Sequence, residues 1–370
     1  MKRILVAVLV ATLLAPVVPA VAANKTQNSW TTTHKIVYVG LTPKDQPNFW
    51  TENQVDTTTA TSDGEMLSFA KETVKNAITF WKKNSRNKMK FTTSQFFIGK
   101  PGTAIERCNS SADIKAGMKI AGLKTVPIGT HIVVVNIYDS CGYAGLGSQG
   151  GNAVNLRSFS TTTLVHELGH NFGYYHSSAM YCDNSDYTKF NATNCHVGEY
   201  DDFRDLMGND EWCPSATLSA TQRATIFHTP LAKTLKTGVD ITIDDSNLIT
   251  DNIVYEFNYK GVWYFFEYYV PTRDRCMFVS SHLYQPQIQV RMIGPNWVMD
   301  KGMAVGPTLI TRIDSDLPVS VSSLLPDLLP VDWTLTGFLA GEKFQLPGAP
   351  FTLTVKSTGA TSAVFSVTKS

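Results

Sequence analysis

The sequence lacks most of the signatures that would assign a protein to a common functional class. Its formal net charge is only +1 over 370 residues, with charges of both signs interspersed. Proteins that bind nucleic acid or anionic lipid usually carry a basic patch, so we expect neither as a partner. The chain contains no G-x-x-x-x-G-K-[ST] phosphate loop and no G-x-S-x-G serine-nucleophile motif.

Cysteine is scarce, and no two cysteines have the C-x-x-C spacing of a cysteine-only zinc site. The count of six is even, which favours disulfides in an exported chain. Sequence alone does not choose among the possible pairings. The short intervening loop favours the pair Cys182–Cys195, and Cys108–Cys141 is a plausible second pair. The remaining pair would be Cys213–Cys276, across a predicted domain boundary.

Long apolar runs are also absent, except at the N-terminus. A basic head precedes the apolar run Ile4–Ala15, and Pro16 and Pro19 then interrupt any helix. Ala20–Ala22 has the A-x-A form of a cleavage site, which favours a signal peptide over a membrane helix. We therefore expect a signal peptide over residues 1–22. The mature protein should be secreted, either extracellular or periplasmic and wall-associated, with no membrane contact after cleavage.

What the sequence does contain is the stretch Thr163–His176, TLVHELGHNFGYYH, with the pattern H-E-x-x-H-x-x-G-x-x-H. On a helix His166 and His170 are one turn apart, so both imidazoles leave the same face. Neutral imidazoles held in this way suit Zn²⁺, which prefers nitrogen and sulfur ligands. Glu167 could reach a metal-bound water without ligating the metal, so we expect it to be the catalytic general base.

A glycine and a third histidine complete the pattern. Gly173 can adopt a positive φ at no steric cost, so a turn there would bring His176 back as a third ligand. A catalytic zinc site uses three protein ligands and one open position, and we expect one catalytic Zn²⁺ on His166, His170 and His176. The alternatives are a helix with three histidines of no function, and a metal site without activity.

Further along, the segment Tyr200–Gly208 reads YDDFRDLMG. A long zinc motif followed by a methionine-containing turn is typical of the metzincin metallopeptidases, which this chain resembles. Within that clan, the segment is similar to the Y-x-D-x-x-D-x-M-G segment of the gametolysin family. The resemblance implies a two-part catalytic domain with Met207 beneath the zinc as an apolar base. The alternative is a buried methionine unrelated to the metal. Asn209 stands where some metzincins have a zinc-assisting tyrosine, so no tyrosine is assigned.

Hydrophobic periodicity from Lys35 to His228 predicts an α/β pattern of strands and helices. The resemblance implies that residues 30–233 form an α+β, metzincin-like catalytic domain with a twisted mixed sheet, an active-site helix and a Met-turn. We expect strands at residues 36–40, 90–98 and 131–138, and helices at residues 65–83, 111–123 and 218–227. Ser158, Ser160 and Thr161 offer N-caps for the zinc helix, which should end near Gly173.

The glycine-rich stretch Gly142–Ser158 precedes the zinc helix. Its composition favours a flexible bulge leading into an edge strand, which could pair with an extended peptide through main-chain hydrogen bonds. A surface loop with no role in substrate binding is the alternative.

From Lys236 the sequence changes to short alternating segments between turn residues, which predicts an all-β, sandwich-like domain over residues 236–370. The aromatic run Trp263–Tyr269 could contact carbohydrate or peptide, although alternation should bury half of it. The Asp183–Asp186 cluster could bind Ca²⁺, but it lacks the spacing of a known loop. Five further histidines each stand alone without ligand spacing: His34, His131, His196, His228 and His282.

Together these features predict a secreted zinc metalloendopeptidase that cleaves extracellular or cell-wall proteins or glycoproteins by Glu167-assisted attack of a zinc-bound water. The preference for peptides over esters rests on the family resemblance. The alternatives are a metzincin proteinase of another family, and a metal-containing adhesin or binding protein without proteolytic activity.

Overall fold

The structure is a computed structural model. It describes residues 33–41, 63–100, 108–136, 141–182, 195–200, 202, 205–208, 217–227, 231–248, 250–270, 285–293, 308–310, 312–313, 334–335 and 337–370. The predicted signal peptide, the Asp183–Asp186 cluster and the Cys213–Cys276 pair lie outside these residues. Within them, no helix is long and apolar enough to cross a membrane.

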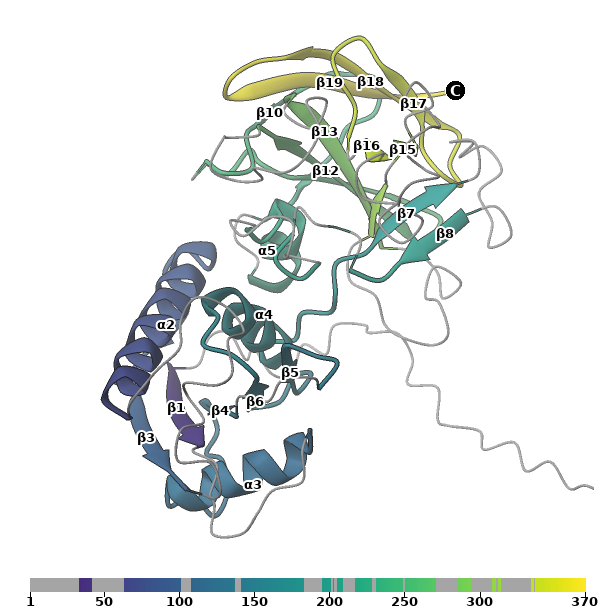
Figure 1. The fold of residues 1–370 in the computed structure, drawn as a ribbon. Helices are drawn as coiled ribbons and strands as arrows, with labels where there is room; N and C mark the ends of the chain where they lie inside the picture. Colours follow the sequence, from purple (N-terminus) through teal and green to yellow (C-terminus); the bar gives the residue numbers. More distant parts are fainter. Residues whose placement is uncertain are drawn as a thin grey trace, which may run out of the picture.

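The chain is a mixed α/β protein, and its first half is built on a six-stranded mixed sheet (Figure 1). The strands run in the order β2-β1-β4-β6-β5, and β3 also pairs with β1. All pairings are parallel except that of β5 with β6. The strands are β1 Thr33–Leu41, β2 Lys90–Phe91, β3 Gln95–Gly99, β4 Thr130–Val135, β5 Gly145–Gly147 and β6 Ala153–Leu156.

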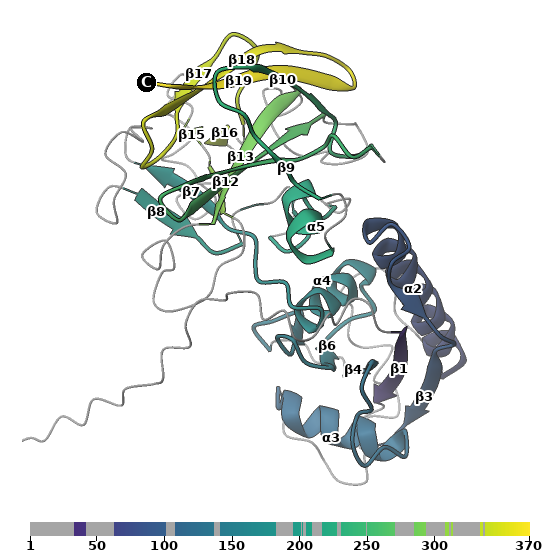
Figure 2. The same cartoon turned by 180° about the vertical axis from the view of Figure 1, so that it is seen from behind.

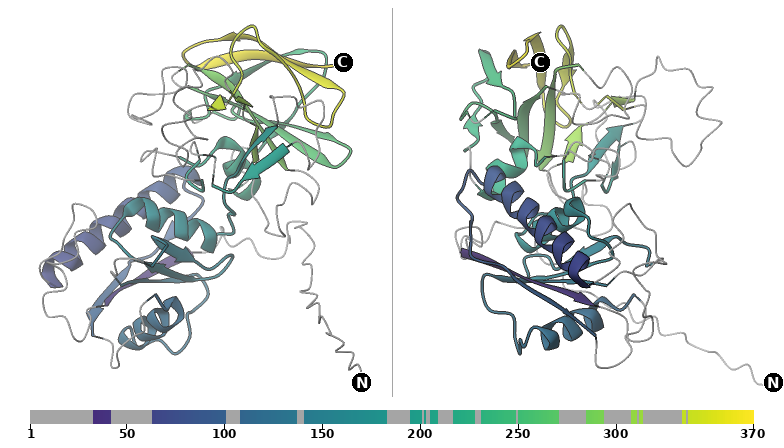
Figure 3. Two further views of the ribbon diagram at one scale, coloured as in Figure 1. Left: turned by 45° about the vertical axis from the view of Figure 1, so that its right-hand side comes forward. Right: turned by 60° about the vertical axis from the view of Figure 1, so that its left-hand side comes forward.

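Helices cover both faces of this sheet, as Figure 3 shows. Helices α2 (Asp63–Asn84) and α4 (Thr161–Asn171) lie on one face, and α3 (Ser110–Ile120) lies on the other. The alternation along β1 explains both layers, because successive side chains of a strand point to opposite faces. Ile36 and Tyr38 join the core beneath α2 and α4, whereas alternate residues of the same strand pack with α3.

The second half of the chain is dominated by two larger sheets whose side chains form one hydrophobic core. The seven-stranded sheet has the order β8-β7-β14-β13-β12-β11-β9, and the four-stranded sheet has the order β10-β19-β18-β17. Their strands are β7 Ala179–Cys182, β8 Cys195–Gly198, β9 Lys233–Thr234, β10 Asp240–Asp244, β11 Tyr255–Tyr259, β12 Val262–Tyr269, β13 Gln287–Ile293, β14 Thr308–Ile310, β17 Lys343–Gln345, β18 Phe351–Thr358 and β19 Ser362–Lys369. A separate pair is formed by β15 (Arg312–Ile313) and β16 (Thr334–Leu335).

Among the described residues, helix α5 (Ala220–Phe227) and the hairpin of β7 and β8 are the secondary-structure elements that link the two halves. Helix α5 lies between α4 and the large sheet, as Figures 1 and 2 show. Its Phe227 enters the core beneath α2, and Ala224 packs against Phe265 of β12. Strands β7 and β8 come after Thr163–His176 in the chain but pair into the sheet of β12 and β13 through β14. The segment that follows Thr163–His176 is therefore part of the second half.

Most predicted elements are present, with four corrections. The strand predicted at residues 90–98 is two short strands, β2 and β3, and the strand predicted at residues 131–138 ends at Val135. The edge of the six-stranded sheet is β5, inside the glycine-rich stretch, whereas β6 lies between β4 and β5. In the aromatic run of β12 only Trp263 is exposed, because α5 and the second sheet cover both faces of the strand. The predicted disulfides Cys108–Cys141 and Cys182–Cys195 are both formed.

Candidate metal centre

Helix α4 places the histidines of the motif. It begins after Ser160, whose hydroxyl accepts a hydrogen bond from the backbone N–H of Thr163 at 3.1 Å. This N-cap satisfies one of the donors that a helix start leaves unpaired. After the helix ends, Gly173 adopts a φ of 97°. A glycine reaches this conformation without steric cost, and the chain turns back as the sequence predicts.

The three motif histidines converge on one point. His166, His170 and His176 each offer a ligand atom, and these atoms all lie within 4.8 Å of one another. Two nitrogens on a tetrahedral zinc ion would lie about 3.4 Å apart at ordinary Zn–N distances. Small side-chain adjustments would therefore let the imidazoles close on an ion. Among the described residues, this is the one group of histidine, cysteine or acidic side chains that could hold a metal.

Each imidazole is oriented by a hydrogen bond from its Nδ1 atom. His166 donates to the carbonyl oxygen of Leu206 at 2.9 Å, and His170 donates to that of Tyr174 at 2.9 Å. His176 donates to a carboxylate oxygen of Glu199 at 2.6 Å. These acceptors fix the proton on Nδ1, so the lone pair of Nε2 is available to a metal in all three rings.

The surroundings also favour the neutral form that binds metal. Burial, together with the neighbouring His170, lowers the pKa of His166 to about 3. Burial and His170 likewise lower the pKa of His176 to about 3, and burial lowers that of His170. Protons therefore compete poorly with a metal ion for these nitrogens.

Glu167 lies beside the histidines and is packed against β5. Its side chain is buried. A Cβ atom added at Gly145 would lie 2.7 Å from Cγ of Glu167, and one added at Gly147 would overlap its carbonyl oxygen. Only glycine lets the edge strand approach so closely. Two glycines of the predicted flexible bulge are thus close-packing positions against the predicted catalytic carboxylate.

The turn of β5 into β6 is fastened to the end of α4. The backbone N–H of Gly150 donates to the carbonyl of His170 at 2.8 Å. The Asn171 amide donates to the carbonyls of Ser148 and Ala153 at 3.0 and 3.1 Å. Its oxygen accepts from Nδ1 of His131 at 3.0 Å.

His131 in turn contacts a second histidine. Nδ1 of His34 lies 2.9 Å from Nε2 of His131, and both rings are buried. The prediction that these two histidines stand alone is therefore wrong. They form a structural pair beneath the end of α4, since His131 holds Asn171 and both rings pack edge-on against Phe172.

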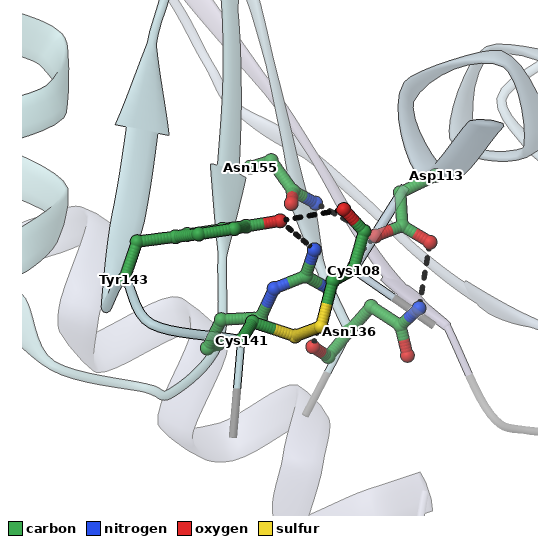
Figure 4. Close-up of a disulfide and its surroundings, with 7 residues drawn as sticks. Cys108, Asp113, Asn136, Cys141, Tyr143 and Asn155 are labelled. Carbon is green, nitrogen blue, oxygen red and sulfur yellow. Dashed lines mark hydrogen bonds and ion pairs between the residues drawn. A yellow bond between two sulfur atoms is a disulfide. The ribbon is translucent and has the colours of Figure 1, made fainter. Parts of the chain in front are cut away.

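A buried polar cluster holds the chain that leads into β5 (Figure 4). Asp113 of α3 accepts hydrogen bonds from Asn136 at 2.6 Å and from Arg157 at 2.8 Å. Arg157 also donates to the hydroxyl of Tyr143, two residues before β5. The Cys108–Cys141 disulfide closes the same region. The position of the edge strand is therefore fixed by a buried ion pair and a disulfide.

The segment around Met207 packs against helix α4 and orients one of the histidines, His166. The Sδ atom of Met207 packs so closely on α4 that a Cβ added at Gly169 would overlap it. The backbone N–H of Met207 donates to Asp205 at 2.9 Å, and the second carboxylate oxygen of Asp205 accepts from the N–H of Ser219 at 2.9 Å. A Cβ at Gly208 would overlap the carbonyl of Asp202. These contacts explain the spacing of the acidic, methionine and glycine positions in YDDFRDLMG.

Asp202 of the same segment is held by the second half of the protein. Arg291 of β13 donates to Asp202 and to Glu267 of β12, and all three side chains are buried. Glu267 also accepts from the backbone N–H of Thr221 at 3.2 Å. Burial raises the pKa of Glu267 to about 7 and lowers that of Arg291 to about 9. The support of the metal centre thus extends into the large sheet.

The chain matches no protein-family model and no curated protein. The geometry of the three histidines and their surroundings is therefore the basis for proposing a function. Three neutral nitrogen donors can bind a cation, and a four-coordinate ion held by them would keep one position for water or substrate.

Two further residues complete the centre: Glu199, which the sequence did not single out, and Tyr200, which it singled out only as the first residue of the segment YDDFRDLMG. Glu199 holds His176, and the ring of Tyr200 lies against the rings of His176 and His166. Burial, together with the carboxylates of Glu199 and Glu167, raises the pKa of Tyr200 to about 12. The predicted Cys182–Cys195 disulfide was the sequence feature that could have placed these two residues beside His176. In the antiparallel hairpin of β7 and β8, Cys182 lies opposite Cys195. If this register is continued, residues 199 and 200 lie opposite residues 178 and 177, next to His176.

Proposed function

We propose that this chain is a secreted zinc-dependent endopeptidase of the metzincin type, most similar to the gametolysin family. The observation that supports it most strongly is the convergence of His166, His170 and His176, each with Nδ1 engaged and Nε2 available. The motif in which they lie and the methionine turn beneath them support the family assignment.

Zinc fits the donor set better than Ca²⁺ or Mg²⁺ does. Three imidazoles without a bound carboxylate or thiolate suit a borderline-soft ion, whereas Ca²⁺ and Mg²⁺ prefer oxygen ligands. When bound, the ion would act as a Lewis acid toward the substrate carbonyl and would lower the pKa of a water molecule.

Glu167 supplies the general base in this mechanism. Its carboxylate takes a proton from the attacking water, the water oxygen forms a bond to the scissile carbonyl carbon, and the C–N bond then breaks. Glu167 returns the proton to the leaving amine, so that atoms and charge balance. The close packing of Gly145 and Gly147 holds the carboxylate in place during both transfers.

The edge strand β5 offers a route for substrate binding. It has β6 on one side, and within the described residues no strand pairs with its other side. An extended peptide could add to this edge through main-chain hydrogen bonds. This supports a protein or glycoprotein substrate rather than a small ester.

The proposed organisation has three parts: a signal peptide over residues 1–22, a metallopeptidase domain over residues 30–233 and a β-sandwich-like domain over residues 236–370. The two disulfides fit an oxidising compartment outside the cytosol. Since β7 and β8 pair into the later sheet, the last domain would be structurally joined to the metallopeptidase rather than tethered to it.

The test compares Glu167→Gln with the exposed control Glu72→Gln in α2. Casein cleavage and bound zinc are measured in the same preparations. We expect Glu167→Gln to retain about one zinc ion per chain and to lose activity by at least 10²-fold, while the control keeps both. Zinc retention without casein cleavage in the wild type would favour the non-proteolytic binding protein. Wild-type activity in Glu167→Gln would exclude the proposed role of this residue.

His176→Ala tests the ligand set separately. It removes one of three nitrogen donors, so we expect zinc affinity to fall sharply. Equal zinc affinity in His176→Ala and wild type would remove this histidine from the site.

A further inference from the structure

Tyr200 occupies a position that ordinary packing does not explain. Its backbone φ is 69°, in the left-handed region that residues other than glycine rarely adopt. The preceding residue, Glu199, is held by its hydrogen bond to His176. With Glu199 fixed, the left-handed turn at Tyr200 folds its ring back onto the histidine cluster. Strained backbone of this kind is enriched at functional sites.

The ring lies against metal-binding histidines rather than in a hydrophobic core. Its centroid is 3.7 Å from that of His176, and it stacks on His166 at 6.2 Å with an interplanar angle of 19°. Tyr200 is 38% exposed, whereas the core tyrosines Tyr38 and Tyr174 are each 1% exposed. One face of the side chain therefore covers two ligand rings, and the rest faces the solvent from which a substrate arrives.

The opposite side of the histidine cluster is already filled. Met207 packs under α4, and Leu206 accepts from His166 there. The open side is consequently bordered by Tyr200 and by Glu167, whose carboxylate acts electrostatically on the tyrosine phenol. A neutral hydroxyl at this border is a hydrogen-bond donor without the charge of a lysine or arginine.

We propose that Tyr200 is a catalytic residue whose hydroxyl donates a hydrogen bond to the oxygen of the scissile carbonyl as negative charge develops there, while its ring shields His176 and His166 from solvent. This inference rests on the proposed peptidase function and adds a residue to it. No proton is transferred by Tyr200; the O–H bond stays intact, and Glu167 carries the proton as described above. A donor aimed at a developing oxyanion stabilises the transition state more than the bound substrate.

The two parts of the side chain can be separated by substitution. Tyr200→Phe keeps the ring and removes the hydroxyl, whereas Tyr200→Ala removes both. Tyr259→Phe, on β11 in the large sheet, is the matched control for loss of a phenol hydroxyl. Three quantities are measured in each: zinc affinity of the metal-free protein by chelator competition, kcat and KM on a casein-derived peptide, and affinity for a phosphinic analogue of that peptide.

We expect Tyr200→Phe to keep wild-type zinc affinity and KM, and to lose about 10²-fold in kcat, as for removal of one oxyanion donor. Its affinity for the phosphinic analogue should weaken by a similar factor, because the phosphinate mimics the tetrahedral oxyanion. Tyr200→Ala should in addition bind zinc more weakly. The control should match wild type in all three.

Wild-type kcat and wild-type phosphinate affinity in Tyr200→Phe would overturn the proposal. A fall in zinc affinity in Tyr200→Phe as large as in Tyr200→Ala would also overturn it, since the hydroxyl would then serve the metal rather than the substrate. If the wild type cleaves no peptide, the proposed function fails, and phosphinate binding to the zinc-loaded proteins still decides the role of Tyr200.

Discussion

Replacing Arg291 by methionine should destabilise the protein far more than a surface charge change. Arg291 pairs with Asp202 and Glu267, and all three side chains are almost completely buried. Methionine fills a similar volume but leaves two buried carboxylates without their cation. Removing one partner of a buried ion pair costs about 3–5 kcal/mol. Total stabilities of about 5–15 kcal/mol are ordinary, so this loss is a large fraction of the whole.

The same substitution should also disturb the candidate metal centre. The backbone N–H of Asp205 donates to the carbonyl of Asp202 at 3.2 Å, and Asp205 holds the N–H of Met207. A displaced Asp202 therefore shifts the turn whose Leu206 carbonyl orients His166. We expect Arg291→Met to bind zinc more weakly than wild type, although it touches no ligand.

Urea unfolding of the metal-free proteins and zinc titration by chelator competition test both effects. The matched control is Arg86→Met, because Arg86 pairs with Asp251, whose side chain is 80% exposed. An exposed pair contributes at most about 1 kcal/mol. The triple variant Arg291→Met, Asp202→Asn, Glu267→Gln also removes the two buried carboxylate charges, so it should recover part of the lost free energy of unfolding. If Arg291→Met cost no more than Arg86→Met, the buried network would not be the support inferred here.

Two further predictions concern the histidines and the edge strand. Because burial holds the pKa of His166 and His176 near 3, against about 6.5 in the unfolded chain, their contribution to stability is present above pH 6.5 and is lost as pH falls toward 3. The free energy of unfolding of the metal-free protein should therefore fall by up to about 1.4 kcal/mol per pH unit for each of these histidines. Urea unfolding between pH 7 and 4 should show a shallower pH dependence of this free energy in His166→Gln than in wild type. An unchanged slope would contradict the lowered pKa of His166. Gly147→Ala should lower kcat by about 10²-fold, because its Cβ would overlap the Glu167 carbonyl and displace the base; Leu146→Val, exposed on the same strand, should be near wild type, and equal kinetics in both would contradict the packing argument.

The sequence was sufficient where the chemistry is local. The spacing of His166 and His170 follows from helix periodicity, and the positive φ at Gly173 follows from its lack of a side chain. Both lie within one short segment, so the ligand set could be predicted from pattern alone. The cap at Ser160 and the core position of Trp81 are likewise local or periodic features.

What could not be predicted depends on residues brought together from distant parts of the chain. Glu199 reaches His176 only because the hairpin of β7 and β8 returns in a particular register. The burial of Phe265 depends on α5 covering a strand face that alternation alone would leave to solvent. Arg291 meets Asp202 from 89 residues away. Pairings of this kind leave no periodic trace in a sequence.

These long-range contacts make the second half of the chain part of the metal centre. A fragment covering residues 30–233 would retain every predicted ligand and Glu167, but it would lose Arg291 and also β14, the strand that pairs with β7. Asp202 would then lack Arg291, and β7 would lack the pairing with β14. We expect this fragment to unfold at low urea concentration and to bind zinc weakly. The chain from residue 23 to residue 370 should resist urea and bind zinc tightly. Limited proteolysis and chelator competition on the two proteins measure the difference. A fragment with wild-type stability and zinc affinity would show that the large sheet is an accessory, and that the turn around Met207 is stable without its buried arginine.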